Sequence, residues 1–234
     1  MFTNVFTPES WAEAVSVIKS EFLLGIWETF YVTVLSTLFA LIIGLPLGVL
    51  LVAGDKDGVL PLPRPVMQVL NVIINLLRSI PFLILMIMAF PIARLLIGTT
   101  IGTKASIVPL VIAAFPFVAR LVESSLRELD PNIIEMAQSM GSSTWQIITR
   151  VMLPESVPSL VTNFTLAITT ILGYTAMSGA MGGGGLGKIA INYGYSRYKY
   201  AVLYLAVIVL VLLVQIFQTI GTRLAARLDK RIKK

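Results

Sequence analysis

The sequence predicts an all-α integral membrane protein with five transmembrane helices. Of its 234 residues, 56% are hydrophobic and only 13% are charged, a composition typical of membrane proteins. Five stretches poor in charge are long enough to cross a bilayer, or become so when extended, since crossing takes about 20 apolar residues. The sequence has no Cys and no His, which excludes disulfides, thiol chemistry and histidine-ligated metals.

The five spans are expected over approximately residues 23–52, 66–93, 104–124, 156–180 and 200–222. No long linker divides the chain, so residues 1–234 are predicted to form a single transmembrane domain. Pro81 lies inside the second span. It should bend or break the helix there, because proline lacks a backbone N–H and its ring clashes with the preceding turn.

The second span carries polar residues on one helical face, because Gln68, Asn71, Asn75 and Arg78 are spaced three, four and three residues apart. Polar groups are costly in hydrocarbon, so this face should point toward other helices or a wet cavity. It would then either line a translocation path or pack against neighbouring polar groups. With a mildly polar face of the fourth span, the residues predicted for a path are Asn71, Asn75, Arg78, Tyr174, Met177 and Ser178.

The distribution of charge predicts which side of the membrane each end occupies. Basic residues concentrate between Arg223 and Lys234, and basic flanks stay in the cytoplasm, so the C-terminus is expected inside. Five spans then place the N-terminus outside. The N-terminal segment agrees, because Glu9, Glu13, Glu21 and Glu28 stand against Lys19 alone.

The stretch Gly182–Lys188 fits the spacing of a phosphate-binding loop, but nucleotide binding is not expected there. The residue after the lysine is Ile189, which has no hydroxyl for magnesium, and a spanning helix rather than a β-strand precedes the stretch. On the outer side, it is expected to be a flexible loop whose glycines allow close packing and positive φ, or a gate. The residues of this outer gate loop are Gly182, Gly183, Gly184, Gly185 and Gly187.

A cytoplasmic loop over approximately residues 125–155 is predicted to form two short helices. Asp130 and Pro131 are a good N-cap and first helical position, so a helix should run from Pro131 to about Met140. Gly141 suits the left-handed position at its end. A second helix, capped by Ser142 or Ser143, should end near Arg150, and Pro154 should begin the next span.

The two loop helices have apolar positions that suit packing and docking. Ile133, Ile134 and Ala137 can pack the first helix against the membrane domain. Trp145, Ile148 and Met152 are expected to form an apolar stripe on the second, which a soluble partner with a groove could receive. Just before the loop, the spacing of Arg120, Glu123 and Arg127 predicts local ion pairs.

At this loop the sequence resembles a known family. The spacing E-x-A-x-x-x-G-x9-V-x-L-P, from Glu135 to Pro154, resembles the "EAA" signature of permease subunits of bacterial ABC importers. It departs from that signature at Met136, where Ala is usual, and at Val151, where Ile is usual. The stretches RSIPF from Arg78, GGGGLG from Gly182 and NYGY from Asn192 resemble the methionine-uptake branch. The resemblance covers roughly residues 23–227.

The resemblance implies an ABC importer permease fold of the type I kind. It also implies a second copy of the chain, two cytoplasmic ATPase subunits that hold ATP and Mg, and an external solute-binding protein. The chain itself would be a transport subunit without catalysis, cofactor, metal or nucleic acid, in the cytoplasmic membrane of a bacterium. By this resemblance, the ATPase-coupling residues are Glu135, Ala137, Gly141, Ser142, Ser143, Trp145, Ile148, Leu153 and Pro154.

The function implied by the resemblance is import of methionine, as the D or L form, or of a closely related amino acid by alternating access. Another small solute for the same importer class is an alternative. An ion-coupled secondary transporter is a further alternative, but such proteins usually keep an acidic residue within a span. In this sequence all acidic residues are expected in loops, span ends or the N-terminal segment.

Overall fold

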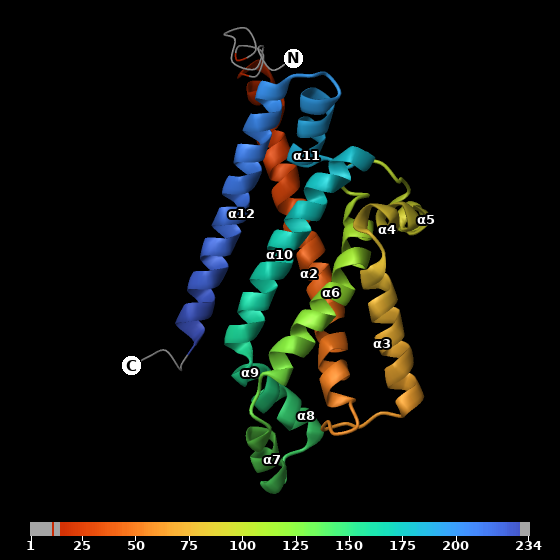
Figure 1. The fold of residues 1–234 in the computed structure, drawn as a ribbon, viewed down its shortest axis with the longest axis vertical. Helices are drawn as coiled ribbons and strands as arrows, with labels where there is room; N and C mark the ends of the chain where they lie inside the picture. The colour runs from red at the N-terminus through yellow and green to blue at the C-terminus, as the bar shows by residue number, and fades with distance from the viewer. Residues whose placement is uncertain (1–10, 12–14, 230–234) are drawn as a thin grey trace. The chain divides into compact units, whose positions relative to one another are not determined.

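The computed structural model describes residues 11 and 15–229, which are almost entirely helical and contain no strand (Figure 1). Parts of the predicted N-terminal acidic segment, including Glu9 and Glu13, lie outside the described residues, as do the last four basic residues of the C-terminal segment. The elements of the first half are η1 (Ile18–Phe22), α2 (Leu23–Ala53), α3 (Arg64–Ser79), α4 (Phe82–Met88), α5 (Phe90–Ile97) and α6 (Ile107–Arg127).

The second half begins with the short helices of the predicted cytoplasmic loop and ends in two long helices. Its elements are α7 (Pro131–Ser139), α8 (Thr144–Gln146), η2 (Ile147–Met152), α9 (Leu153–Glu155), α10 (Val157–Ser178), η3 (Gly179–Met181), α11 (Gly185–Ile189), η4 (Ala190–Tyr195) and α12 (Tyr200–Leu228). Three of the η segments, namely η1, η2 and η4, are π-helical, whereas η3 is a 3₁₀ turn.

Four described helical runs are long and apolar enough to cross a membrane: Val15–Ala53, Ile107–Arg127, Val157–Met181 and Tyr200–Leu228. A fifth span results if α3 and α4 are counted together as one broken helix. The break lies at Ile80, which is extended with ψ 127°, and at Pro81. Proline disfavours helical geometry at the preceding residue, so the interruption expected from Pro81 is confirmed.

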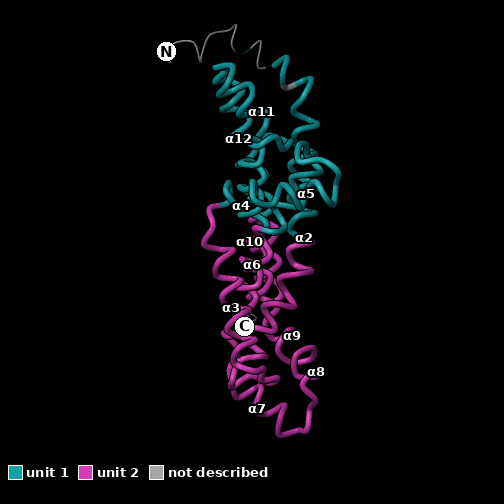
Figure 2. Tube along the Cα trace, turned by 90° about the vertical axis from the view of Figure 1, so that its right-hand side faces the viewer, with its two compact units in different colours: residues 1–37, 82–112, 168–217 teal, residues 38–81, 113–167, 218–234 magenta. Residues whose placement is uncertain are grey.

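The chain divides into two compact units (Figure 2). Unit 1 comprises residues 1–37, 82–112 and 168–217, and unit 2 comprises residues 38–81, 113–167 and 218–234. In unit 1, α11 provides Leu186 and Ile189 to a core that also contains Phe22, Val202 and Ala206. Burial of these side chains fixes the short helix α11 against η1 and the beginning of α12.

In unit 2, two glycines let α2 and α6 approach closely. A Cβ atom on Gly44 would lie 2.7 Å from a methyl group of Val118, and one on Gly48 would lie 2.6 Å from the carbonyl oxygen of Ala119. Side chains larger than hydrogen therefore do not fit at either position. We call Gly44, Gly48, Val118 and Val122 the glycine seam.

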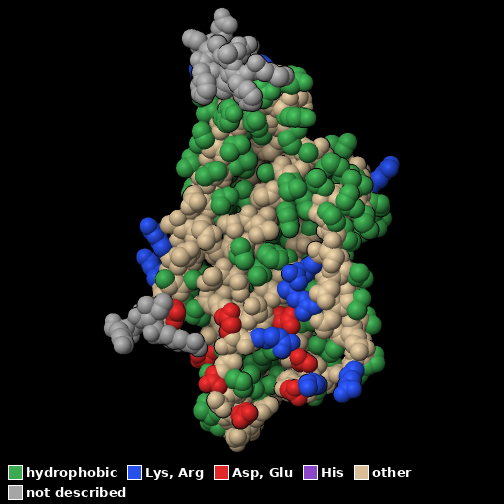
Figure 3. All heavy atoms as spheres, viewed as in Figure 1, with side chains coloured by type: hydrophobic (Ala, Val, Ile, Leu, Met, Phe, Trp, Pro, Cys, Tyr) green, Lys and Arg blue, Asp and Glu red, His purple; other side chains and the backbone are tan. Residues whose placement is uncertain are grey.

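The surface of unit 2 is charged where its loops and short helices lie. On the face in Figure 3, acidic and basic side chains gather over α7, α8 and the adjoining ends of α3 and α6. Large hydrophobic side chains are exposed along the helices of both units, including Trp27 and Leu95 in unit 1 and Val69 and Leu76 in unit 2. Such exposure is expected where lipid surrounds a helix.

Candidate functional site

The first helix of the predicted cytoplasmic loop begins and ends at the expected residues. The Asp130 carboxylate accepts a hydrogen bond of 3.0 Å from the backbone N–H of Asn132, and Pro131 is the first helical residue. At the other end Gly141 has φ +75°. Its N–H donates to the carbonyl of Gln138 at 2.9 Å. This geometry strongly favours glycine, because a side chain is strained at positive φ.

The second helix begins with a capping box at Ser143. The Ser143 hydroxyl accepts from the N–H of Gln146, and the Gln146 side chain accepts from the N–H of Ser143 at 2.9 Å. Ser143 is therefore the cap, and not Ser142. The predicted end near Arg150 is wrong, because the helical backbone continues through η2 to Glu155 in α9. Pro154 lies within α9, and the next long helix begins only at Val157.

The predicted apolar stripe on the second helix is divided between core and surface. Ile148 and Met152 are buried, whereas the Trp145 side chain is 73% exposed. The prediction assumed α-helical periodicity, but η2 is π-helical, and its wider turn changes which residues share a face. On the first helix Ala137 is buried, with Ile133 and Ile134 half-buried, as packing toward the rest of the chain requires.

The loop exposes three large apolar side chains, which we call the docking residues. They are Met136, Met140 and Trp145, with exposed fractions of 59%, 78% and 73%. The Thr144 hydroxyl donates to the carbonyl of Val59 at 3.2 Å, which ties the loop to the connection between α2 and α3. This hydrogen bond anchors the loop to the rest of unit 2, while the three docking residues remain exposed.

The remaining predicted coupling residues lie on the surface or partly covered. Glu135 is exposed, and its carboxylate has no ion-pair partner among the described residues. Leu153 is half-buried and Pro154 is exposed. Glu135 therefore contributes surface charge in this conformation.

A chain of charges and amides joins α3, α6 and the α2–α3 connection in unit 2. Arg120 contacts Glu123 at 2.5 Å, and Arg127 contacts Glu123 and Asp55, each at 3.0 Å. The ion pairs predicted from the spacing of Arg120, Glu123 and Arg127 are confirmed. Hydrogen bonds from Arg127 and from the backbone N–H of Lys56 hold the pKa of Asp55 below its ordinary value.

The polar face of α3 accepts hydrogen bonds from Arg120 in α6. One guanidinium nitrogen donates to the side-chain oxygens of Asn71 at 2.8 Å and Asn75 at 2.9 Å. This contact was missed at the level of sequence, because the spacing of Arg120 points only to neighbours on its own helix. Arg78, on the same predicted polar face, is exposed.

The other residues predicted for a translocation path lie in unit 1. Tyr174 stacks on Phe82 with ring centroids 4.4 Å apart. Met177 is 42% exposed, whereas Ser178 is fully buried and its hydroxyl donates to the carbonyl of Thr175 at 2.7 Å. Asn71, Asn75 and Arg78 belong to unit 2, so neither unit contains all six residues.

The glycine stretch is packed rather than open. Gly182 and Gly185 have φ +86° and +78°, and the residues from Gly183 to Gly187 are buried. The expectation of close packing and positive φ is confirmed, whereas the expected flexible loop is not seen. The N–H of Gly185 donates to the Glu28 carboxylate at 2.7 Å, and that of Leu186 donates to the Thr29 hydroxyl at 2.9 Å. These two N–H groups are therefore not free to bind a phosphate.

Glu28 is the acidic residue that directly precedes the first uncharged stretch of the sequence. Its position, the sixth residue of α2, lies within the helical run Val15–Ala53 that can cross a membrane. On sequence grounds Glu28 is expected in the acidic N-terminal segment, one position before the uncharged stretch that begins at Thr29. Because the run of 39 residues is longer than a crossing needs, that expectation stays a prediction.

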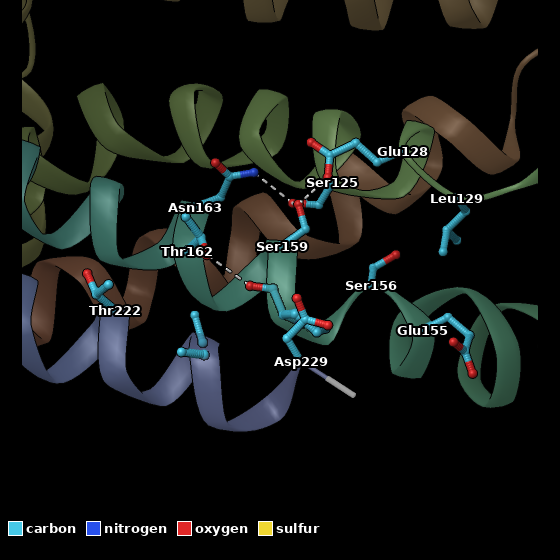
Figure 4. Close-up of a pocket in the computed structure, with 13 residues that line it drawn as sticks. Ser125, Glu128, Leu129, Glu155, Ser156, Ser159, Thr162, Asn163, Thr222 and Asp229 are labelled. Carbon is cyan, nitrogen blue, oxygen red and sulfur yellow. Dashed lines mark hydrogen bonds between the residues drawn. The ribbon is translucent and has the colours of Figure 1, made fainter. Parts of the chain in front are cut away.

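A cavity of about 510 Å³ lies in unit 2 where α6 ends, α10 begins and α12 ends (Figure 4). Its lining includes the carboxylates Glu128, Glu155 and Asp229 and no basic residue. Figure 4 shows Ser125 meeting polar groups of α10, and Asn163 donates to its hydroxyl at 2.7 Å. No group of acidic residues in the described part of the chain is arranged to hold a metal ion.

The chain is similar to several proteins named as transport permeases. It is 48% identical over 208 residues to a probable D-methionine transport system permease protein MetI of Pasteurella multocida, covering 89% of this chain and 95% of that one. It is 44% identical over 215 residues to a probable D-methionine transport system permease protein MetI of Vibrio cholerae, covering 92% and 95%.

Solved structures agree with this similarity. A chain of the MetNI methionine ABC transporter, in inward-facing conformations, superposes with a TM-score of 0.87 at 40% identity, covering 89% of this chain and 96% of that one. A chain of a bacterial alginate ABC transporter gives a TM-score of 0.72 at 17% identity, covering 92% and 82%, and shares the fold. Residues 44–234 match the family of binding-protein-dependent transport system inner membrane components, and the chain belongs to that family of ABC importer permeases.

Proposed function

We propose that this chain is the membrane-spanning subunit of an ATP-driven importer that carries methionine, as the D or L form, or a closely related amino acid. The observation that carries the proposal is the similarity over nearly the whole chain to proteins named as D-methionine permeases. The superposition on the methionine transporter chain supports the same substrate class. Import would proceed across the cytoplasmic membrane of a bacterium.

The working assembly would contain two copies of this chain, two cytoplasmic ATPase subunits and an external solute-binding protein. ATP and Mg would be held by the ATPase subunits, and this chain would supply no cofactor site. In this proposal residues 1–234 form one transmembrane domain, with the N-terminus outside and the C-terminus in the cytoplasm. The excess of basic residues after Arg223 supports that orientation.

The loop of residues 125–155 would couple ATP hydrolysis to transport. The docking residues Met136, Met140 and Trp145 present apolar surface that water does not favour, and exposed apolar groups of this kind suit a groove on a partner. The caps at Asp130 and Ser143 and the corner at Gly141 give the loop a defined shape. A rigid loop can transmit a displacement of the ATPase to the membrane helices, whereas a flexible loop would change its own conformation instead.

Transport would follow alternating access, in which closure of the two ATPase subunits draws the two loops together and changes the side on which the path opens. The path would be lined by Asn71, Asn75, Arg78, Tyr174, Met177 and Ser178. The glycines from Gly182 to Gly187 would form the outer gate. Their buried, hydrogen-bonded packing supports a closed outer side in this conformation.

Reconstitution tests the proposal. The chain, its ATPase and its binding protein are placed in proteoliposomes, and uptake of labelled L-methionine and D-methionine is measured with and without ATP. ATP-dependent uptake that excess unlabelled methionine suppresses is the expected result. Suppression by a different amino acid, with no effect of methionine, would assign another substrate. Uptake that follows an ion gradient without ATP would overturn the importer class.

A further inference from the structure

Glu28 holds together two segments of unit 1 that are far apart in the sequence. One carboxylate oxygen accepts a hydrogen bond of 2.8 Å from the hydroxyl of Thr103, and the other accepts one of 2.7 Å from the backbone N–H of Gly185. The Glu28 side chain is half-buried and lies in a helix whose neighbours are apolar. A carboxylate in such surroundings is costly unless donors surround it, and here each oxygen has one.

Two further hydrogen bonds fasten the same segments. The hydroxyl of Thr29, which is 1% exposed, accepts from the N–H of Leu186. The N–H of Gly102 donates to the carbonyl of Gly182 at 2.8 Å. The glycine segment, residues 182–187, is thereby joined both to α2 and to the turn of residues 99–106. Glu28, in α2, contacts the glycine segment as well as that turn.

The fit around the carboxylate leaves no room for a side chain. A Cβ atom on Gly184 would lie 2.5 Å from a Glu28 oxygen and still closer to the Thr103 hydroxyl. The neighbouring helical run, α11 with the η4 turn that continues it, covers only residues 185–195, and isolated helices of that length are marginal in solution. The position of the segment therefore depends on its contacts, and Glu28 supplies the two charge-assisted ones.

We propose that Glu28 is a positioning residue for transport, which holds the glycine segment in its closed conformation and releases it when the outer side opens. This inference rests on the proposed function, in which that segment is the outer gate. The carboxylate acts on the backbone of the gate and touches no substrate. Loss of its hydrogen bonds should loosen the gate while the rest of unit 1 keeps its fold.

The absence of cysteine from the sequence makes a direct test possible. Leu186→Cys places one thiol on the glycine segment at a position that is fully buried. The variant is combined with Glu28→Ala, Glu28→Gln or Glu21→Gln, assembled with the ATPase in proteoliposomes, and treated with a membrane-impermeant maleimide. Glu21→Gln is the matched control, because that carboxylate lies just before α2 but accepts from Tyr193 instead of the segment.

The expected result is labelling roughly tenfold faster in Glu28→Ala, the order expected from losing a charge-assisted hydrogen bond. Glu28→Gln should label near the parent rate, because its amide oxygen can accept from Gly185 and its NH₂ can donate to the Thr103 hydroxyl. Glu21→Gln should also leave the rate unchanged. Labelling of Glu28→Ala at the parent rate would overturn the proposal, as would equal acceleration in the Glu21 control.

A second variant tests the proposal if the Glu28→Ala protein does not insert into the membrane. Thr103→Val removes one of the two donors and leaves the carboxylate in place, so the segment should label about threefold faster, from partial loss of the hold. No acceleration in Thr103→Val would contradict the proposal independently.

Uptake, measured in the same liposomes without the Leu186→Cys change, separates this inference from the proposed function. Glu28→Ala should lose most of its uptake per ATP hydrolysed, and Glu28→Gln should recover it. If the parent protein imports neither methionine nor another amino acid, the proposed function fails. The labelling result, which needs no substrate, would still decide whether Glu28 holds the segment. Normal coupling in Glu28→Ala despite faster labelling would show that the hold has no part in transport.

Discussion

Asn71 accepts a hydrogen bond of 2.8 Å from Arg120, a residue 49 positions later in the chain. The contact joins α3 to α6 inside unit 2, and Asn75 accepts from the same nitrogen. The two terminal nitrogens of Arg120 thereby bind two neutral amides and the carboxylate of Glu123, whereas its buried Nε has no hydrogen-bond partner among the described residues. A helix with a polar face can therefore lie against a membrane-spanning helix without leaving a charge unpaired.

Replacing Asn71 with Ala should destabilise the protein, because Arg120 loses one acceptor. We expect a loss of about 1 kcal/mol, less than the roughly 1.5–3 kcal/mol typical of hydrogen bonds to charged groups, because Asn75 remains as an acceptor. Thermal unfolding of the detergent-solubilised chain checks this. Arg78→Ala, on the exposed part of the same helix, is the control and should change stability by less than about 0.5 kcal/mol. Equal shifts in the two variants would contradict the assignment.

Gly141 should tolerate Asn far better than Val. No heavy atom lies within 4 Å of the position that a Cβ atom would occupy there, so space is not limiting, but φ +75° strains a branched side chain and suits Asn. Gly141→Val should uncouple ATP hydrolysis from uptake, whereas Gly141→Asn should retain most of the coupling. Both rates are measured in proteoliposomes containing the full complex. Normal coupling in the Val variant would show that the corner is not needed.

Trp145 should matter for assembly rather than for folding. Its side chain is 73% exposed, so Trp145→Ala removes little buried area from this chain. At a docked interface, loss of a central Trp typically costs about 2 kcal/mol or more, so binding of the ATPase should weaken at least tenfold. Trp145→Phe should keep most of the affinity. The measurement is the dissociation constant of the ATPase subunit from this chain in detergent or nanodiscs. Unchanged binding of the Ala variant would mean that the ATPase binds at another surface.

The Asp55–Arg127 contact predicts a dependence of stability on acid. Because hydrogen bonds lower the pKa of Asp55 in the folded protein, its contribution to stability is present above its unfolded pKa. That contribution is lost as the pH falls through the lower folded pKa. Wild type should thus unfold at a higher temperature than Asp55→Asn near pH 7, and the difference should shrink as the pH falls below the ordinary range of an aspartate.

Asp57→Asn serves as the control for that experiment. Its carboxylate is 84% exposed and contacts only the neighbouring Lys56 at 3.5 Å. Such a pair contributes little in water, so the variant should unfold at the wild-type temperature throughout. A pH-dependent gap of the same size in Asp57→Asn would mean that overall charge, and not the Arg127 contact, produces the effect.

The proposed orientation can be read from two single-cysteine variants. Thr99→Cys and Lys56→Cys both place the thiol at an exposed position in a connection between helices. In intact cells an impermeant maleimide should label the first, and it should label the second only after permeabilisation. The reverse pattern would invert the topology.

Local chemistry made the ends of the short helices predictable. Asp130, Pro131, Gly141 and Ser143 act through hydrogen bonds or backbone angles within a few residues, so their roles can be inferred from the neighbouring sequence. Pro81 likewise breaks the helix by its own covalent geometry. These effects need no knowledge of the rest of the fold.

Contacts between distant segments were not predictable in the same way. Gly185 lies 157 positions after Glu28, and the spacing of residues along one helix does not say which other segment it faces. The burial of Ile148 apart from Trp145 depends on a π-helical turn, which the apolar pattern alone does not reveal. The candidate path residues have the same weakness, since a polar face is compatible with packing as well as with a path.

The glycine seam has a consequence for how such sequences can change over time. Gly44 and Gly48 are four residues apart, as are Val118 and Val122, and each glycine receives the valine at the matching level. Inserting or deleting a single residue between either pair would turn one contact away by about 100° and leave a side chain where none fits. Length changes among relatives should therefore fall in the loops and spare both four-residue intervals, even where the amino acids around them differ.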